Sequence, residues 1–473
     1  METINTDLCV IGGGSGGLAL AAGAVQMGAR VVLLEGGRMG GDCLNYGCVP
    51  SKALLAAAHA AHAFSVGTPF GVGEARARVD FPAVKDHVTD VIAQIAPHDS
   101  IERFEGLGVR VIPEYGRFIA PREVQAGESV IRARRFVVAT GSSPLVPPIP
   151  GLEAVPHFTN ETIFDLRKRP EHLIIIGGGP IGMEMAQAHL RLGCRVSVIE
   201  GMKALGRDDP ELSAILLDRL RGEGLELHED ALAESVHADA DGITVTIKGG
   251  AQVTGSHLLV AAGRKPNIER LDLDRAGIRH TRSGIEVGDD LRSSNRRVYA
   301  IGDVTGREQF THVAGYHAGV VIRSILLGLP AKARGGHIPW VTYTDPELAQ
   351  VGLTEARAKQ AHGTARVSVV RFAFADNDRA RAERAISGLV KVMVVRGRPV
   401  GATIVGRQAG ELIGVWSMAI ANGLKMRALA DTILPYPTLG EVNKRAAGAY
   451  FSPKLFDNPM LKRVVGAVQK VLP

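Results

Sequence analysis

The chain has 473 residues, too many for a single hydrophobic core, so we expect two to four domains. Its 45% hydrophobic and 22% charged residues are typical of a globular protein, and its four cysteines are too few for a secreted disulfide scaffold. The basic residues behind the net charge of +6 are scattered, METINTD lacks the basic start of a signal peptide, and no apolar run is long enough to span a bilayer. We therefore expect a cytoplasmic protein without nucleic-acid or membrane partners.

Residues 7–37, DLCVIGGGSGGLALAAGAVQMGARVVLLEGG, predict a strand, a glycine turn, a helix and a second strand. The turn has the spacing GxGxxG at Gly12, Gly14 and Gly17, and Glu35 follows by about twenty residues. The first glycine allows the tight bend, the second lets backbone N–H groups approach a pyrophosphate, and the third lets the helix pack on the strand. The glutamate would accept hydrogen bonds from a ribose, so this segment predicts a dinucleotide site.

The next segment, residues 40–55, reads GGDCLNYGCVPSKALL and contains two of the four cysteines. Cys43 and Cys48 lie just ahead of an alanine-rich helix that Pro50 is expected to open. Lys52 follows Cys48 by four positions, so the two side chains share a helix face if the helix begins by Cys48. An ammonium group and a helix N-terminus both favour a thiolate, and a cysteine pair in a cytoplasmic protein is more often catalytic than structural.

Residues 172–202, HLIIIGGGPIGMEMAQAHLRLGCRVSVIEGM, repeat the first pattern without a gap. The turn glycines are Gly177, Gly179 and Gly182, and Glu200 takes the place of Glu35. A single GxGxxG is a weak signal, but two in the same strand–turn–helix–strand context predict that the chain binds two dinucleotides.

Two further segments each predict an apolar strand that ends in a turn, FVVATGSSP at 136–144 and RVYAIGDVTG at 297–306. Either alone would be an ordinary connection between a strand and a helix. Together they suggest that the first domain returns to its sheet after an insertion.

With CLNYGCVPSK at 43–52, GRKPN at 263–267 and IPWVTYTDPELAQVGLTEARA at 338–358, these segments resemble the flavoprotein pyridine nucleotide–disulfide oxidoreductases. This family includes dihydrolipoamide dehydrogenase, glutathione reductase and mercuric reductase, and the resemblance covers nearly the whole chain. It implies an enzyme that binds FAD at the first dinucleotide site and a nicotinamide dinucleotide at the second.

The resemblance also implies an α/β fold with two Rossmann-like dinucleotide-binding domains and an α+β C-terminal dimerisation domain, and therefore a homodimer. The FAD-binding domain would be split over residues 1–150 and 270–335. The NAD(P)-binding domain would be residues 151–269, and the dimerisation domain residues 336–473.

By the resemblance, Glu35 holds the adenosine ribose of FAD and Glu200 a ribose of the nicotinamide dinucleotide. A carboxylate at Glu200 favours NADH, because it repels the 2′-phosphate of NADPH without excluding that cofactor. The other expected cofactor contacts are Lys52, Gly116, Thr140, Gly141, Ser142, Gly263, Asp303 and Thr311. Thr311 stands where the family often has alanine. Asp42 stands where it usually has threonine, and its carboxylate is expected to raise the pKa of Cys43.

The same resemblance gives the cysteines separate roles. Cys48 would face the flavin as a thiolate, Cys43 would exchange with the substrate, and Glu184 would pair with Lys52. Electrons would pass from NAD(P)H through FAD to a Cys43–Cys48 disulfide, and from the dithiol to a small-molecule substrate.

One segment departs from the disulfide-reducing members, ILPYPTLGEVNKRAAG at 433–448. Pro437 and Glu441 match, but Tyr436 stands where those members have the histidine that the partner subunit supplies as acid–base group. A tyrosine, with a pKa of about 10, is a poor proton shuttle near neutral pH. Mercuric reductase has tyrosine at this position, although this chain ends in GAVQKVLP without the C-terminal cysteine pair of that enzyme.

The sequence therefore predicts a mercuric-reductase-like flavoprotein that passes electrons from NAD(P)H to a thiophilic metal ion or a disulfide, with no resident metal site. Three alternatives remain: a dihydrolipoamide dehydrogenase with an atypical acid–base group, an NAD(P)H oxidase or diaphorase that uses quinone or oxygen, and a non-enzymatic flavoprotein partner of a complex. The physiological acceptor and the direction of turnover stay open at this point.

Overall fold

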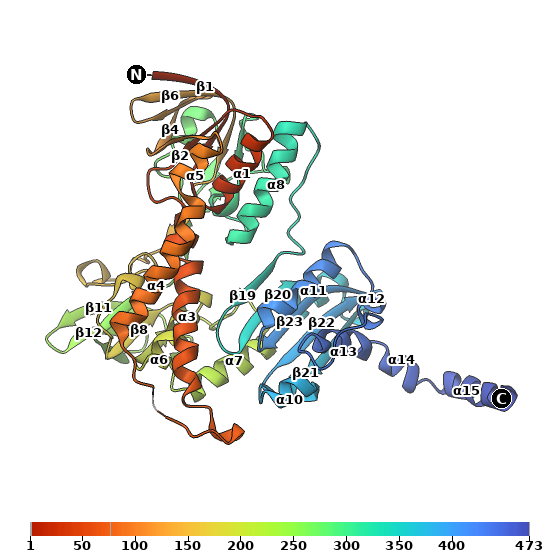
Figure 1. The fold of residues 1–473 in the computed structure, drawn as a ribbon. Coiled ribbons are helices and arrows are strands. Elements are labelled where there is room, and N and C mark those ends of the chain that lie inside the picture. Colours follow the sequence, from red (N-terminus) through yellow and green to blue (C-terminus); the bar gives the residue numbers. More distant parts are fainter. Residues whose placement is uncertain (1, 76, 473) are drawn as a thin grey trace. The chain divides into compact units, whose positions relative to one another are not determined.

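The computed structural model describes residues 2–75 and 77–472, which form an α/β fold divided into two compact units (Figure 1). The first unit takes residues 1–68, 73–202 and 226–335, and the second takes residues 69–72, 203–225 and 336–473. The expected α/β class is confirmed. Both dinucleotide-binding patterns lie in the first unit, so the boundaries of the three expected domains stay a prediction.

A mixed sheet in the order β3-β2-β1-β6-β5-β4, with β18 beside β6, forms the core of the first pattern. Its strands are β1 (Glu2–Ile11), β2 (Val31–Leu34), β3 (Arg110–Ile112), β4 (Gly116–Ala120), β5 (Glu123–Ala126), β6 (Ser129–Val138) and β18 (Val298–Ala300). β18 pairs in parallel with β6, which confirms that the chain returns to this sheet after the second pattern.

The sheet is buried on both faces, which explains the continuous apolar run of β1. Leu8 and Val10 pack with helices α1 (Ser15–Gln26) and α8 (Thr311–Leu327). The alternate residues Cys9 and Ile11 pack in a separate core on the other side of the sheet. Cys9 is therefore a buried thiol, as its place in an apolar strand indicates.

The second pattern forms a parallel sheet in the order β10-β9-β8-β14. Its elements are β8 (His172–Ile176), α6 (Pro180–Arg191), β9 (Arg195–Ile199), β10 (Glu226–His228) and β14 (His257–Val260). A separate antiparallel sheet contains β11 (Ala233–Asp239), β12 (Gly242–Ile247) and β13 (Gln252–Gly255). The rest of this unit includes α2 (Gly41–Asn45), α3 (Cys48–Ala63), α4 (Phe81–Ile95), α5 (Ile101–Gly106) and the paired strands β7 (Ser142–Pro144) and β15 (Arg264–Pro266), as well as β16 (His280–Thr281) and β17 (Gly284–Ile285).

The second unit is built on an antiparallel sheet in the order β19-β20-β23-β22-β21. Its strands are β19 (Pro339–Thr342), β20 (Glu347–Gly352), β21 (Val367–Ala373), β22 (Leu389–Val395) and β23 (Arg398–Gly406), and its helices are α7 (Pro210–Gly222), α9 (Glu355–His362), α10 (Asp378–Ala382), α11 (Ala409–Ala421), α12 (Met426–Ala430), α13 (Glu441–Ala449), α14 (Ser452–Phe456) and α15 (Pro459–Val471). Val390 and Val392 of β22 pack in a core that includes Trp416 of α11.

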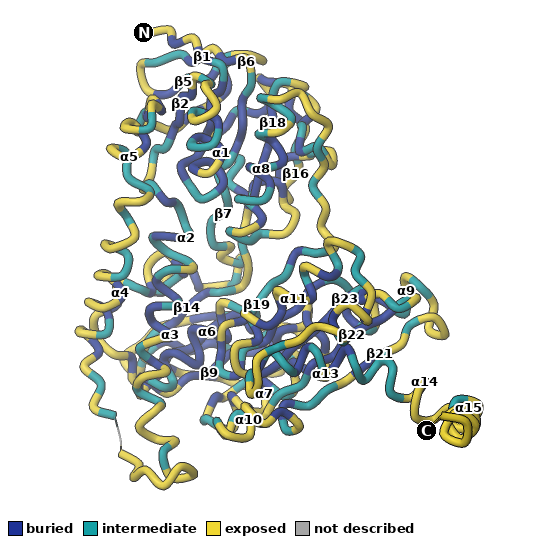
Figure 2. The backbone as a smooth tube through the Cα atoms, turned by 45° about the vertical axis from the view of Figure 1, so that its right-hand side comes forward, coloured by how far each residue is buried: buried dark blue, intermediate teal, exposed yellow. Residues whose placement is uncertain are grey.

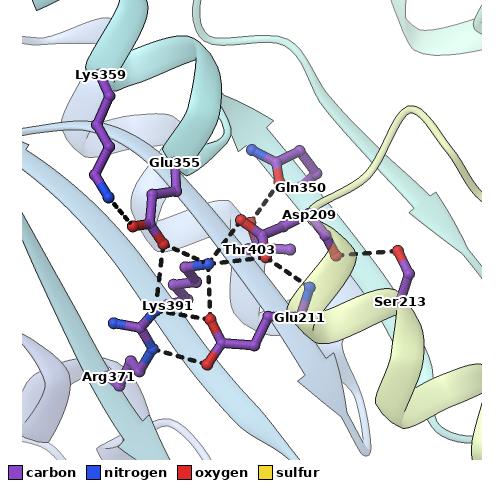
Figure 3. Close-up of polar contacts among 9 residues, drawn as sticks. All are labelled: Asp209, Glu211, Ser213, Gln350, Glu355, Lys359, Arg371, Lys391 and Thr403. Atoms are coloured by element: carbon purple, nitrogen blue, oxygen red, sulfur yellow. Dashed lines mark hydrogen bonds and ion pairs between the residues drawn. The ribbon is translucent and has the colours of Figure 1, made fainter. Parts of the chain in front are cut away.

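Lys391 lies between those two valines and therefore points to the opposite face of β22, where it meets the start of α7 (Figure 3). Its ammonium lies 2.9 Å from Asp209, 2.8 Å from Glu211 and 2.7 Å from Glu355, and Arg371 also binds Glu211. Burial by itself lowers the pKa of Lys391, but hydrogen bonds to Glu211, Glu355 and Asp209 outweigh it and raise the pKa above its usual value. This cluster joins the 203–225 segment to the C-terminal sheet, which sequence patterns did not predict.

The part of the chain that the structure describes contains no helix long and apolar enough to cross a membrane.

Candidate active site

The first glycine turn has the geometry that close approach of an anion requires. Gly12 has a φ of 112°, and a Cβ on it would lie 2.4 Å from the carbonyl oxygen of Ala139. A Cβ on Gly17 would lie 1.9 Å from the oxygen of Gly12, so only glycine fits there. Gly14 precedes α1 without a side-chain cap, and a Cβ on it would meet only Gly41, at 3.9 Å. The N-terminus of α1 is therefore open to a phosphate.

The second turn reproduces this geometry. Gly177 has a φ of 117°, and a Cβ on Gly182 would lie 1.9 Å from the oxygen of Gly177. Gly179 precedes α6 without a side-chain cap, and a Cβ on it would meet no heavy atom within 4 Å. Two cradles that side chains would fill thus fit two dinucleotides, which supports FAD and a nicotinamide dinucleotide as the groups held here.

The two expected ribose acceptors are equivalent in position. Glu35 accepts from the N–H of Gly13 at 2.6 Å and of Gly37 at 2.7 Å. Glu200 accepts from the N–H of Gly178 at 2.7 Å and of Met202 at 2.9 Å. Because these bonds fix each carboxylate beside its glycine turn and each oxygen has a further lone pair, both glutamates are placed to accept from a ribose.

The cysteine pair lies where the short helix α2 meets the first residue of the longer helix α3. Cys43 is in α2, and Cys48 is the first residue of α3, so the helix begins where the shared face with Lys52 requires. Both are described as free thiols, and the Sγ of Cys48 lies 3.3 Å from the Oγ1 of Thr311 in α8. Thr311, expected as a cofactor contact, is thus also a direct neighbour of the pair.

The surroundings of the two sulfurs favour different protonation states. A hydrogen bond from Cys43 lowers the pKa of Cys48 to about 6, with help from Thr311 and Lys52 and against burial and Asp42. The pKa of Cys43 is raised by its hydrogen bond with Cys48, by burial and by the charge of Cys48. Asp42 raises it as well, in the expected direction, but is the smallest of the causes. The pair can therefore hold a thiolate at Cys48 beside a thiol at Cys43.

Lys52 and Glu184 form the expected ion pair. The Nζ of Lys52 lies 2.8 Å from the Oε2 of Glu184, whose side chain is only 6% exposed in α6. The ammonium also lies 3.3 Å from the hydroxyl of Ser51. Because Glu184 is buried, its ion pair with Lys52 holds the ammonium group in place. The ammonium then lies close enough to the two cysteines to lower the pKa of Cys48.

A polar network that the sequence analysis missed surrounds Asp42. The guanidinium of Arg264 lies 3.1 Å from Asp42 and donates to the hydroxyl of Ser142 at 2.7 Å, and Asn160 donates to Asp42 at 3.0 Å. Arg264 belongs to the GRKPN segment, in which the sequence predicts only Gly263 as a cofactor contact. This arginine offsets the charge of the carboxylate that replaces the usual threonine beside Cys43.

The remaining expected flavin contacts gather around the same network. Asp303 accepts from the hydroxyl of Ser142 at 2.6 Å, and burial raises the pKa of its carboxyl group. Thr140 donates to the carbonyl oxygen of Asn267 at 2.7 Å, and Asn267 donates back to that of Thr140 at 2.9 Å. Gly141 and Gly263 have positive φ values of 68° and 136°.

Gly116 lies at the start of β4. A Cβ on Gly116 would lie 2.6 Å from the Cδ1 of Leu34, so a side chain there would displace Leu34. Its assignment to the adenine stays a prediction.

Tyr436 and Glu441 both belong to the second unit. Of the residues that the structure describes, no hydrogen bond joins these two side chains. The hydroxyl of Tyr436 donates to Asp378 at 3.0 Å, which raises the pKa of the phenol. Among the described residues, the buried Oε2 of Glu441 has no hydrogen-bond partner. The segment therefore presents an exposed tyrosine and retains the buried carboxylate that would orient an imidazole.

These features define a flavin- and nicotinamide-dependent redox site, and comparison with known proteins agrees. The chain matches the family described as pyridine nucleotide-disulphide oxidoreductase over residues 6–318, and the dimerisation domain of that family over residues 338–447. The chain belongs to this family, whose members depend on FAD and take electrons from NAD(P)H. It is an oxidoreductase and carries a dimerisation domain.

Among particular relatives, a mercuric reductase of Streptomyces lividans is 36% identical over 461 residues, covering 94% of this chain and 96% of the relative. A dihydrolipoyl dehydrogenase of Geobacillus stearothermophilus is 33% identical over 457 residues, covering 94% and 96%. Among solved structures, a Cu(II) complex of the HOCl-induced flavoprotein disulfide reductase RclA from Escherichia coli has a TM-score of 0.85 at 26% identity, covering 94% of this chain and 99% of that one.

Proposed function

We propose that this protein uses NADH to reduce a thiophilic metal ion or a disulfide through the Cys43–Cys48 pair, in the manner of a mercuric reductase. Bound FAD would supply the hydride acceptor and pass two electrons to the disulfide. Those electrons break the S–S bond and leave a thiolate at Cys48 and, after uptake of one proton, a thiol at Cys43. The low pKa of Cys48, near 6, supports this division.

The observation that carries the choice of substrate is the state of Tyr436. A phenol whose pKa is raised by Asp378 is a still poorer proton acceptor than free tyrosine near neutral pH. Thiol–disulfide exchange at Cys43 needs such an acceptor, whereas capture of a thiophilic metal by two sulfurs depends less on it. One relative supports a metal substrate by name, as a mercuric reductase, and a solved structure named as a disulfide reductase is a Cu(II) complex.

The proposal includes a homodimer, in which Tyr436 and Glu441 of one subunit would face the cysteine pair of the other. The matched dimerisation domain supports it. So does the apolar surface of the second unit, where Ile433 is 91% and Met418 56% exposed. A cytoplasmic location is also part of the proposal, because Cys9 and Cys194 are buried thiols, not a structural disulfide.

Dihydrolipoamide dehydrogenase remains the second candidate. The buried, unbonded Oε2 of Glu441 favours it, because this carboxylate would suit an imidazole donor better than a tyrosine bound to Asp378. Metal reduction and lipoamide turnover differ in the chemistry that they require at the site, because only lipoamide turnover needs fast proton transfer at Cys43.

A substrate panel with the FAD-loaded enzyme tests the proposal. NADH oxidation is measured with mercuric thiolate, Cu(II), oxidised lipoamide and a soluble quinone, for the natural chain and for Cys43→Ser. We expect metal-dependent turnover that Cys43→Ser abolishes, with lipoamide at least about 100-fold slower, the size of a typical acid–base contribution. Lipoamide turnover that exceeds metal turnover would establish the second candidate. Quinone or oxygen turnover that survives Cys43→Ser would show an oxidase or diaphorase.

A further inference from the structure

The helix α15 has a strong local start and no packing for its apolar face. Asn458 caps it, accepting from the N–H groups of Met460 at 3.0 Å and Leu461 at 3.2 Å, and Pro459 occupies the first turn. None of its described residues is buried, and in Figure 2 the helix carries almost entirely the colour of exposed residues. By contrast, Trp416 of α11 and Val442 of α13 are completely buried in the core of the same unit.

The large apolar residues of α15 share one face. Positions three and four apart on a helix lie above one another, and apolar residues recur at that spacing along the whole element. They are Met460, Leu461, Val464, Val465, Val468 and Val471. Met460 is 75% and Val471 82% exposed, so the whole length of the face is open to solvent. An exposed stripe of this kind marks an interaction surface more often than a chance arrangement.

The opposite face of α15 is cationic. It carries Lys462, Arg463 and Lys470, with Gly466 and Gln469 between them, and residues 459–471 contain no acidic side chain. A complementary surface must therefore be apolar where the valines enter and negatively charged beside them. A bilayer with anionic headgroups has this combination.

We propose that α15 binds the surface of a membrane that contains anionic phospholipid. Thirteen residues form a helix of about 20 Å, shorter than the roughly 30 Å hydrocarbon core, so α15 would lie in the interface and not cross it. The valines would enter the acyl boundary while the three cations contact headgroups. The expectation that the chain has no membrane partner rested on the lack of a spanning run, which does not detect an interfacial helix.

A second copy of α15 is a poorer occupant for the same face. Two such helices packed through their apolar faces would leave Lys462, Arg463 and Lys470 of each copy facing away from the contact, so pairing would use only one of the two faces of the helix. Helix pairing therefore leaves without a partner the cationic face that anionic headgroups would contact.

Flotation of the FAD-loaded enzyme with lipid vesicles tests the proposal. We expect binding to phosphatidylcholine vesicles that contain phosphatidylglycerol, weaker binding to phosphatidylcholine alone, and loss of the difference at high salt. The double variant Val464→Asp/Val468→Asp should lose binding. The triple variant Lys462→Gln/Arg463→Gln/Lys470→Gln should bind about 100-fold more weakly, at about fivefold for each cation near the headgroups.

Gln469→Ala is the matched control, because it changes the polar face without altering either charge or the apolar stripe, and it should bind like the natural chain. Flavin absorbance and NADH turnover should be unchanged in every variant. Binding that survives Val464→Asp/Val468→Asp, or no binding by the natural chain, would overturn the proposal. If that double variant instead reduces the size of the assembly in solution without any vesicle binding, α15 is an interface between copies and the proposal is wrong.

Discussion

Replacing Cys43 by alanine should raise the pKa of the Cys48 thiolate, whereas replacing it by serine should leave that pKa nearly unchanged. The hydrogen bond from Cys43 is the largest of the causes that lower the pKa of Cys48 to about 6. Serine retains a donor at the same position, and alanine does not. Both variants leave Cys48 as a single reactive thiol, because Cys9 and Cys194 are buried.

The size of the effect follows from the hydrogen bond. A bond to a charged group contributes about 1.5 to 3 kcal/mol, and about 1.4 kcal/mol corresponds to a tenfold change in the ionisation equilibrium. Because Cys48 is partly exposed, the lower end applies, and the pKa should move from about 6 to about 7 in Cys43→Ala. At pH 7 the thiolate fraction would fall from about nine-tenths to about one-half.

The rate of alkylation of each FAD-loaded variant by iodoacetamide, measured against pH, reports this fraction, because only the thiolate reacts. The two rate profiles should be displaced along the pH axis, with Cys43→Ser at the lower pH. If the profiles coincide, the hydrogen bond is not the cause. If Cys48 titrates near an unperturbed thiol in both variants, the interpretation of the site as a poised thiolate is wrong.

Substitutions at three further positions test other parts of the proposed site and fold. Lys391→Met should destabilise the protein by about 3 kcal/mol at pH 7 in denaturant unfolding, with Lys391→Arg milder, because the buried carboxylate of Asp209 loses its partner. Arg371 is the largest cause that holds the pKa of Glu211 near 2, Lys359 is the largest for Glu355, and Lys391 lowers both pKa values further, so part of this difference should be present above about pH 5 and shrink as pH falls toward 2; a pH-independent difference would contradict the reasoning. Tyr436→His should raise lipoamide turnover at least about tenfold while flavin reduction by NADH changes little, and no gain with any disulfide would show that this position does not act at the pair. Glu200→Ala should lower the ratio of kcat/KM for NADH to that for NADPH, and a natural enzyme that prefers NADPH would refute the assignment of Glu200.

The parts of the site that short sequence patterns specify were predictable. Each strand–glycine turn–helix unit is formed by residues that are close together in the sequence. The GxGxxG spacing directly marks Gly17 and Gly182 as positions where only glycine fits. The Lys52–Glu184 pair spans 132 positions and was accessible only through the family resemblance, which supplies long-range pairing that one sequence does not contain.

Other contacts were not predictable because each depends on two distant segments meeting. Asp42 was recognised as unusual, but its compensation by Arg264 required the fold to bring residues more than two hundred positions apart together. Lys391 interrupts an apolar strand, and the pattern alone does not show which carboxylates meet it. The partner of Tyr436, Asp378, likewise lies in a separate helix.

The central claim is that the Cys43–Cys48 pair stores electrons between the flavin and the substrate. Anaerobic titration of the FAD-loaded enzyme with NADH, followed by flavin absorbance, tests this claim most directly. We predict that the natural chain takes up a second hydride equivalent per subunit and develops long-wavelength absorbance from the Cys48 thiolate beside the flavin, both lost in Cys48→Ser. Uptake of a single equivalent by the natural chain, with the same spectrum as Cys48→Ser, would contradict the account.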